Sequence, residues 1–129
     1  MSGRVVHFEV PFDDGDRARA FYQKAFGWTI MPMPDMTYTM VGTGPMAENV
    51  GPTEPGYIGG GLTERNELLR GPVITVDVDD IDATLAKIEG LGGKIVRPRQ
   101  EVGDMGFNAY FTDPEGNLTG LWQNAPQNG

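Results

Sequence analysis

The residues with the clearest capacity for chemistry lie near the start of the sequence, where His7 and Glu9 alternate within the segment RVVHFEVP. Alternate residues of a strand point to the same side and lie roughly 6.6 Å apart, so a strand over 4–11 would present both side chains together. Histidine titrates near neutral pH, and a neighbouring carboxylate favours its charged form. The pair is therefore a candidate for binding a ligand or moving a proton. A histidine satisfied by water or by backbone groups is the alternative, and the sequence leaves both open.

Simple counts exclude several kinds of active site. His7 is the only histidine, Ser2 is the only serine, and there is no cysteine. The lack of cysteine excludes disulfides, thiol nucleophiles, iron–sulfur clusters and Cys-ligated zinc. One histidine per chain excludes sites with two histidine ligands, also in a homodimer, because two chains bring two histidines to two equivalent sites. A Ser–His–Asp triad is excluded in practice.

Composition and charge narrow the class of protein. A length of 129 residues, with 39% hydrophobic and 22% charged residues, fits one globular domain over 1–129. The 19 glycines and 10 prolines favour short elements joined by tight turns. The net charge of −8 argues against nucleic-acid binding and favours neutral or cationic small ligands. No apolar run reaches the ~18 residues of a membrane helix, and the first residues do not resemble a signal peptide, so we expect a cytoplasmic protein without membrane contact.

Hydrophobic periodicity predicts two strand–helix units. After the strand at 4–11, aspartates at 13–16 offer helix caps and Gly27 offers a stop. Between them an apolar stripe has helical spacing: Ala18, Phe21, Tyr22, Ala25 and Phe26. Strands are expected at 28–33, 38–41 and 57–62, with a long loop at 42–57. The pattern restarts with a strand at 72–78, a helix carrying Ile81, Leu85 and Ile88, and strands at 94–97, 107–111 and 118–123.

The two halves of the sequence match when one is shifted by 66 residues. Six of the 24 positions from residue 7 to 30 are then identical: Val10/Val76, Asp13/Asp79, Asp14/Asp80, Asp16/Asp82, Ala20/Ala86 and Gly27/Gly93. The match favours an internal duplication, with module one at about 4–64 and module two at about 71–124. The alternative is that two unrelated strand–helix units share similar helix-cap and helix-stop residues.

Five segments resemble a known group of proteins, in the expected order and over nearly the whole chain. They are the opening strand with His7, the helix end FYQKAFGW, and the segments GYIGGGL, VITVDVDDID and TDPEGNLTGLWQ. The resemblance is to the vicinal oxygen chelate superfamily of glyoxalases, bleomycin resistance proteins and extradiol dioxygenases. It implies an α+β fold in which two βαβββ modules form a cupped, partly open eight-stranded mixed sheet around a cavity. It also implies a homodimer.

The resemblance carries an expectation about metal. Enzymes of the superfamily place metal ligands at four strand positions, one near the start and one near the end of each module. His7 stands at the first, the offset puts Val73 at its counterpart, and the last-strand position is Gly120. The end of module one falls within 58–61, an isoleucine followed by three glycines. At most one of four ligands survives, so we expect no metal cofactor.

Polar and aromatic side chains on the faces that the resemblance turns toward the cavity are candidate ligand-binding residues. Glycine at position 120 leaves room where a carboxylate would stand, which favours a flat or bulky organic ligand near Trp122. The predicted ligand-binding set is His7, Glu9, Tyr38, Thr75, Tyr110 and Trp122. Each aromatic residue in the set could instead belong to the core.

Three functions remain open, and catalytic residues are not predicted. The first, which we adopt, is a metal-independent small-molecule binding protein of the antibiotic-sequestering type, with cationic drugs among its candidate ligands. The second is a lyase, isomerase or dioxygenase of the glyoxalase type, in which a divalent metal would bind His7 and carboxylates such as Glu9 or Glu54. The third is a non-catalytic dimeric interaction module, with the 42–57 loop and nearby methionines as its contact surface.

Overall fold

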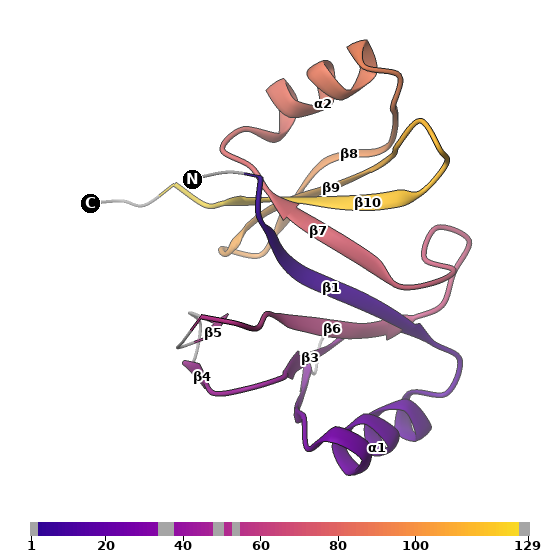
Figure 1. The fold of residues 1–129 in the computed structure, drawn as a ribbon, viewed down its shortest axis with the longest axis vertical. Coiled ribbons are helices and arrows are strands. Elements are labelled where there is room, and N and C mark those ends of the chain that lie inside the picture. The colour runs from indigo at the N-terminus through magenta and orange to yellow at the C-terminus, as the bar shows by residue number, and fades with distance from the viewer. Residues whose placement is uncertain (1–2, 34–37, 48–50, 53–54, 127–129) are drawn as a thin grey trace. The chain divides into compact units, whose positions relative to one another are not determined.

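The computed structural model describes residues 3–33, 38–47, 51–52 and 55–126. Contacts divide the chain into two units, which we call the N-terminal unit (Val6–Val73) and the C-terminal unit (Met1–Val5 with Ile74–Gly129). Each unit follows the order strand, helix, strand, strand, strand, with one additional short hairpin in the N-terminal unit (Figure 1). The expected α+β class with two βαβββ modules is confirmed.

The strands of the N-terminal unit pair in the order β2-β3-β6-β1. Its elements are β1 (Val5–Phe12), α1 (Gly15–Phe26), β2 (Thr29–Met33), β3 (Tyr38–Gly42) and β6 (Gly59–Glu64). The last strand, β6, runs parallel to the first, β1, and the other pairs are antiparallel. The predicted loop at 42–57 contains a small antiparallel pair, β4 (Met46–Ala47) with β5 (Gly51–Pro52), and its residues 48–50 and 53–54 lie outside the described residues.

The strands of the C-terminal unit repeat this plan in the order β7-β10-β9-β8. Its elements are β7 (Val73–Asp77), α2 (Ile81–Gly90), β8 (Lys94–Val102), β9 (Gly106–Thr112) and β10 (Leu118–Asn124). Here too the last strand, β10, runs parallel to the first, β7. Strand β8 extends five residues beyond the predicted 94–97, and it does so through two register shifts against β9.

The two helices begin in the same way, 66 residues apart. The side chain of Asp14 accepts a hydrogen bond from the backbone N–H of Arg17 at 3.1 Å, and that of Asp80 accepts one from Ala83 at 3.1 Å. Both aspartates have extended backbone, as N-cap residues do. The two aspartates that align under the 66-residue offset thus have the same role, as N-caps of their helices.

The two helices bury their apolar residues to different extents. Helix α2 packs Ile81 and Leu85 into a core with Ala109 and Leu121, as its stripe predicts. Helix α1 has no buried residue, and Phe21 is 58% exposed.

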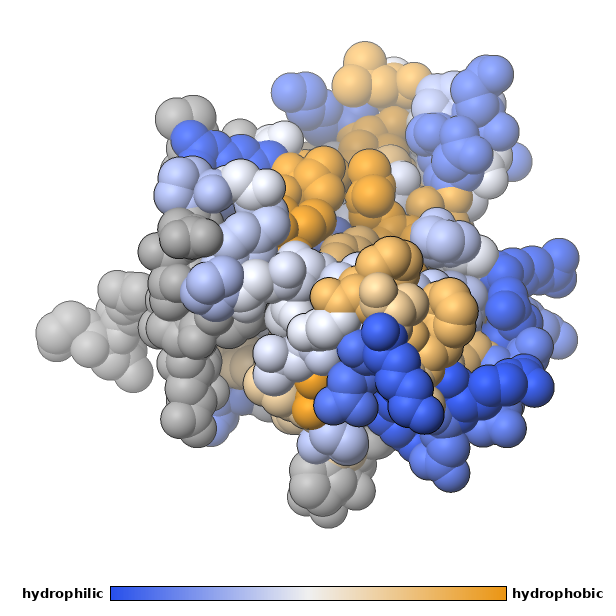
Figure 2. All heavy atoms as spheres, turned by 60° about the horizontal axis from the view of Figure 1, so that its bottom comes forward, coloured by the Kyte–Doolittle hydropathy of each residue, from blue (hydrophilic) through white to orange (hydrophobic). Residues whose placement is uncertain are grey.

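Aromatic rings from α1, from Trp28 and from β1 form a cluster. The rings of Tyr22 and Trp28 stack with centroids 4.8 Å apart, and Trp28 in turn lies 5.7 Å from Phe8. The Phe26 ring joins the same cluster, 5.7 Å from Trp28, and is nevertheless 63% exposed. Figure 2 shows apolar atoms beside strongly hydrophilic ones on the side of the molecule that carries α1.

No helix within the described residues is long and apolar enough to cross a membrane.

Removing the helix cap of the C-terminal unit tests the duplicated start signal. We expect Asp80→Ala to lower the free energy of unfolding by about 1 kcal/mol, because the N–H of Ala83 loses its acceptor. Asp79→Ala is the matched control, since it removes the same charge from the neighbouring position. Urea unfolding of both variants would measure the difference, and equal losses would contradict the cap assignment.

Candidate functional site

Strand register puts His7, Glu9 and Tyr38 on one face of the N-terminal sheet. Glu9 of β1 and Met40 of β3 both pair with Gly61 of β6. His7 and Tyr38 lie two residues before Glu9 and Met40, so all four side chains stand on the same side of the sheet. Helix α1 packs on the opposite side, where the Phe8 ring contacts Trp28. We call the side with His7 the helix-free face of the unit.

The His7 side chain makes a hydrogen bond to Tyr38, which lies 31 residues further along the chain. Its Nε2 lies 2.6 Å from the Tyr38 hydroxyl, and the two rings are nearly parallel, with an interplanar angle of 15°. In either tautomer Nε2 is engaged, either accepting from the phenol O–H or donating to its oxygen. A metal ion could bind Nε2 only after this contact broke.

Burial lowers the pKa of His7 from 6.5 to about 4, because the positive imidazolium loses its solvation. The imidazole is therefore neutral at physiological pH. Neutral histidine acts as a hydrogen-bonding group rather than as a resident charge, although a neighbouring carboxylate by itself would favour the charged form. Glu9 lies on the same face and is only 7% exposed.

Glycine at position 61 makes the contact between Tyr38 and His7 possible. A Cβ atom at Gly61 would collide with the Tyr38 ring and hydroxyl. The phenol therefore crosses the backbone of β6 where any other residue would carry a side chain. Gly60 serves the other face in the same way, because the Phe8 ring occupies the space of its missing Cβ.

The helix-free face of the C-terminal sheet carries the other three predicted residues. Thr75 of β7 and Tyr110 of β9 both pair with Gly120 of β10, and Trp122 lies two residues further along β10. A Cβ atom at Gly120 would lie 2.8 Å from the Thr75 hydroxyl oxygen, so this glycine too is fixed by its neighbours.

The two sheet registers identify which residue of the N-terminal unit corresponds to Gly120. Gly61 pairs with Glu9 as Gly120 pairs with Thr75, and Glu9 and Thr75 are equivalent under the 66-residue offset. Gly61 is therefore the fourth metal-ligand position, which the sequence could place only within 58–61. Both last-strand positions are glycines enclosed by neighbouring side chains.

The residues present do not fit the metal ion of the superfamily's enzymes. The four positions hold His7, Gly61, Val73 and Gly120, of which three have no donor side chain. Among residues 3–33, 38–47, 51–52 and 55–126, no group of three His, Asp or Glu side chains could hold a metal ion. Glu54, one of the carboxylates considered for an altered site, lies outside these ranges.

Two residues that the sequence did not indicate also lie on the C-terminal face. The Arg97 guanidinium lies 5.6 Å from the centre of the Tyr110 ring, a cation–π distance. Asn108 pairs with Trp122, and its buried Oδ1 has no hydrogen-bond partner in the described part of the chain. Alternation along β9 could have placed Asn108 beside Tyr110. Arg97 gave no such signal, because the register of β8 shifts on both sides of it.

Comparisons with known proteins support the resemblance found in the sequence. A family model described as bleomycin resistance protein-like N-terminal matches residues 4–44. The Mycobacterium bovis protein named glyoxylase CFP32 is 31% identical over 115 residues, which cover 85% of this chain and 41% of that protein. A glyoxylase-like domain-containing protein of Didymella fabae is 29% identical over 125 residues, 91% of each chain. These matches support the resemblance of the sequence to the vicinal oxygen chelate superfamily, the glyoxalase and bleomycin-resistance group.

Solved structures support the fold of this superfamily member. Methylmalonyl-CoA epimerase from Mycobacterium tuberculosis has a TM-score of 0.62 at 18% identity, over 96% of this chain and 89% of that one. The chain spans 41% of the length of the first curated relatives it matches, CFP32 of two mycobacteria. The resemblance noted in the sequence is thus confirmed for family and fold.

The titration of His7 can be measured directly, since it gives the only histidine signals of the chain. We expect an NMR midpoint near pH 4 in the folded protein and near 6.5 in urea. Because the folded state binds fewer protons between these values, stability should fall as pH drops from about 6.5 toward 4. A folded-state midpoint at or above 6.5 would contradict the buried, neutral imidazole.

Adding one methyl group tests the packing of Tyr38 on β6. We expect Gly61→Ala to destabilise the protein by about 1–3 kcal/mol through overpacking, and less in a Tyr38→Ala background. Gly90→Ala is the matched control, because its Cβ would meet nothing within 4 Å and should stabilise α2 slightly. Equal effects of the two substitutions in chemical denaturation would refute the contact.

Proposed function

We propose that the protein is a metal-independent small-molecule binding protein that acts in the cytoplasm. The observation that carries the proposal is the state of the four metal-ligand positions. One holds an imidazole whose Nε2 is bonded to Tyr38, and the other three hold Gly61, Val73 and Gly120. The family's scaffold is thus retained while its donor set is replaced by small or apolar residues.

The helix-free faces indicate what kind of ligand such a protein would take. The N-terminal face combines the Tyr38 ring with paired methionines, Met31 of β2 and Met40 of β3. Aromatic rings and adaptable thioethers suit a flat organic ligand. The carboxylate of Glu9 on the same face and the net charge of −8 favour a ligand that carries positive charge.

The C-terminal face supplies groups of the same kind. Trp122 and Tyr110 provide aromatic surface, and Thr75 and Asn108 provide hydrogen-bonding groups. Arg97 lies over Tyr110 and would disfavour a ligand cation at that point. On the N-terminal face, taken by itself, Glu9 is assigned to the cationic part of a ligand and the Tyr38 ring to its flat part.

A glyoxalase-type metalloenzyme is the second candidate, favoured by the names of the relatives. It would require His7 to leave Tyr38 and further ligands to come from residues outside the four strand positions. The donor set described above gives no support to such a site.

The two tryptophans allow a direct test of ligand binding. Trp28→Phe leaves Trp122 as the only tryptophan, on a helix-free face, and Trp122→Phe leaves only Trp28, beneath α1. We expect a member of a panel of cationic aromatic compounds to change the fluorescence of the first variant and not of the second. Calorimetry should then show about tenfold weaker binding after Trp122→Ala.

A matched pair of charge variants tests the assignment of the cation. Glu9→Gln should weaken binding of the cationic compound and leave a neutral analogue unaffected, whereas Glu67→Gln removes an exposed carboxylate and should change neither. The proposal fails if no compound of the panel binds in calorimetry, or if fluorescence changes equally in both single-tryptophan variants.

A further inference from the structure

The helix-free face of the N-terminal sheet gathers three methionines at one edge. Met31 and Met33 alternate on the edge strand β2, and Met40 of β3 pairs directly with Met31. Residues that pair across strands, lie on the diagonal or alternate along one strand are roughly 5–8 Å apart. Since each thioether sits at the end of a flexible side chain, the three sulfur atoms can converge on one point. We call these three residues the thioether cluster.

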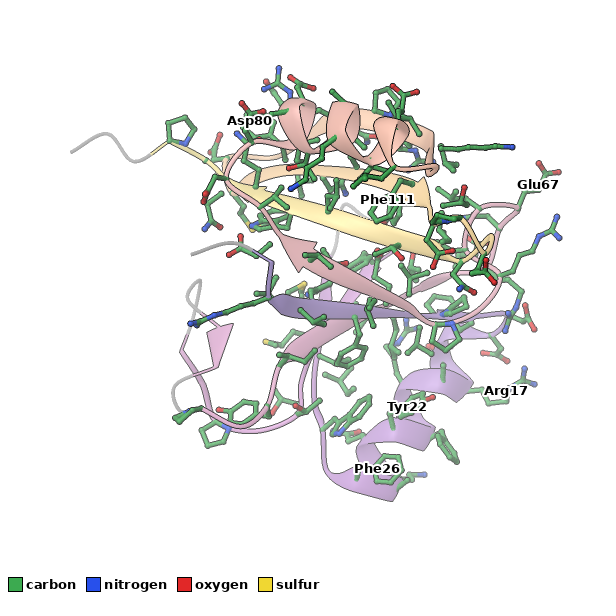
Figure 3. The ribbon with its side chains drawn as sticks, turned by 45° about the horizontal axis from the view of Figure 1, so that its top comes forward. Arg17, Tyr22, Phe26, Glu67, Asp80 and Phe111 are labelled. Carbon is green, nitrogen blue, oxygen red and sulfur yellow. The ribbon has the colours of Figure 1, made fainter. Side chains whose placement is uncertain are left out.

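The thioether cluster does not belong to the buried core of its unit. Thr39, which precedes Met40 on β3, is 2% exposed and accepts a hydrogen bond from Arg19 of α1 at 3.3 Å. Figure 3 shows α1 beside the strands of this unit. Met40 points to the side of the sheet opposite Thr39 and is half-buried, as is Met33, whereas Met31 is 38% exposed. An ion can therefore reach the cluster from solvent.

The bond between Tyr38 and His7 keeps the phenol ring away from the thioether cluster. Tyr38 pairs with Met33 of β2, but its ring extends over Gly61 of β6 toward β1, where it meets His7. In the strand order β2-β3-β6-β1 this is the direction away from β2. The aromatic pair thus lies over β6 and β1, and the thioethers stand on β2 and β3.

The donor chemistry of the thioether cluster selects a soft monovalent cation. Thioether sulfur binds Cu(I), whereas Mg²⁺ and Ca²⁺ prefer oxygen and Zn²⁺ is held by thiolate, imidazole or carboxylate. Because the chain has no cysteine, thioethers are its softest donors. The net charge of −8 adds a general attraction for cations.

We propose that the thioether cluster binds one Cu(I) ion, with the sulfur atoms of Met31, Met33 and Met40 as its three ligands. This site is separate from the four metal-ligand positions of the superfamily, and it does not depend on the organic ligand proposed above. Protein purified in air without added copper is expected to lack the ion, because Cu(I) oxidises to Cu(II), which prefers nitrogen and oxygen ligands.

Titration of the full chain with Ag(I) tests the proposal, since Ag(I) shares the ligand preference of Cu(I) and is stable in air. We expect NMR of the methionine methyl groups to show saturation at one Ag(I) per chain. The signals of Met31, Met33 and Met40 should shift together. Met105, which is 52% exposed between β8 and β9, is the internal reference and should not shift.

Leucine substitutions identify the ligands. Met31→Leu, Met33→Leu and Met40→Leu each remove a sulfur and nearly conserve volume, so circular dichroism should show an unchanged fold. In anaerobic competition with the Cu(I) chelator bicinchoninate, each should weaken binding by at least the roughly tenfold that loss of a ligand's hydrogen-bond partner costs. Met105→Leu is the matched control and should leave binding unchanged.

Both measurements use the metal ion without any organic compound, so failure of the ligand proposal would leave this one standing. No saturable binding of Ag(I) or Cu(I) would overturn the thioether site. Equal losses of affinity after Met105→Leu and after the three substitutions in the cluster would overturn it as well.

Discussion

The contact between the Tyr38 ring and the bare backbone of Gly61 is the constraint on which the site depends. Because β6 pairs in parallel with β1, Gly61 lies opposite Glu9 and within reach of Tyr38 from the other side. The ring can cross β6 only because position 61 has no side chain. Its hydroxyl then reaches Nε2 of His7 and engages the one imidazole that the chain possesses.

The same replacement occurs in the C-terminal unit by a different route. Gly120 lies between Thr75 and Tyr110, and the threonine hydroxyl occupies the space that a side chain at 120 would need. A glutamate could not be restored at either glycine without displacing a neighbour. Neighbouring side chains therefore occupy the space at both glycines, and a donor side chain at either position would require repacking.

Much of the fold could be predicted because its signals are local. Aspartate caps, helical spacing and the 66-residue offset predicted both helices and the succession of strands along the chain. The exposure of α1 could not be predicted from its stripe, because helical spacing identifies an apolar face and not how much of that face the rest of the protein covers. The extension of β8 was missed because Pro98 and the register shifts interrupt its alternation.

Sequence alternation could indicate which of the predicted site residues share a face of a strand, but not which side chains bond to each other. Alternation within a strand put His7 with Glu9 and Gly120 with Trp122. The bond from His7 to Tyr38 depends on the register of three strands that are distant in sequence, and a single sequence contains no signal for such register. The lowered pKa of His7 follows from burial, which likewise comes from tertiary structure rather than from neighbouring residues.

The central claim is that this superfamily member holds no metal at the four strand positions. The most direct measurement is elemental analysis by mass spectrometry of protein purified without a histidine tag or added metal, beside a His7→Ala variant. The account predicts no stoichiometric transition metal in either protein. About one metal ion per chain in the native protein, lost in His7→Ala, would contradict it.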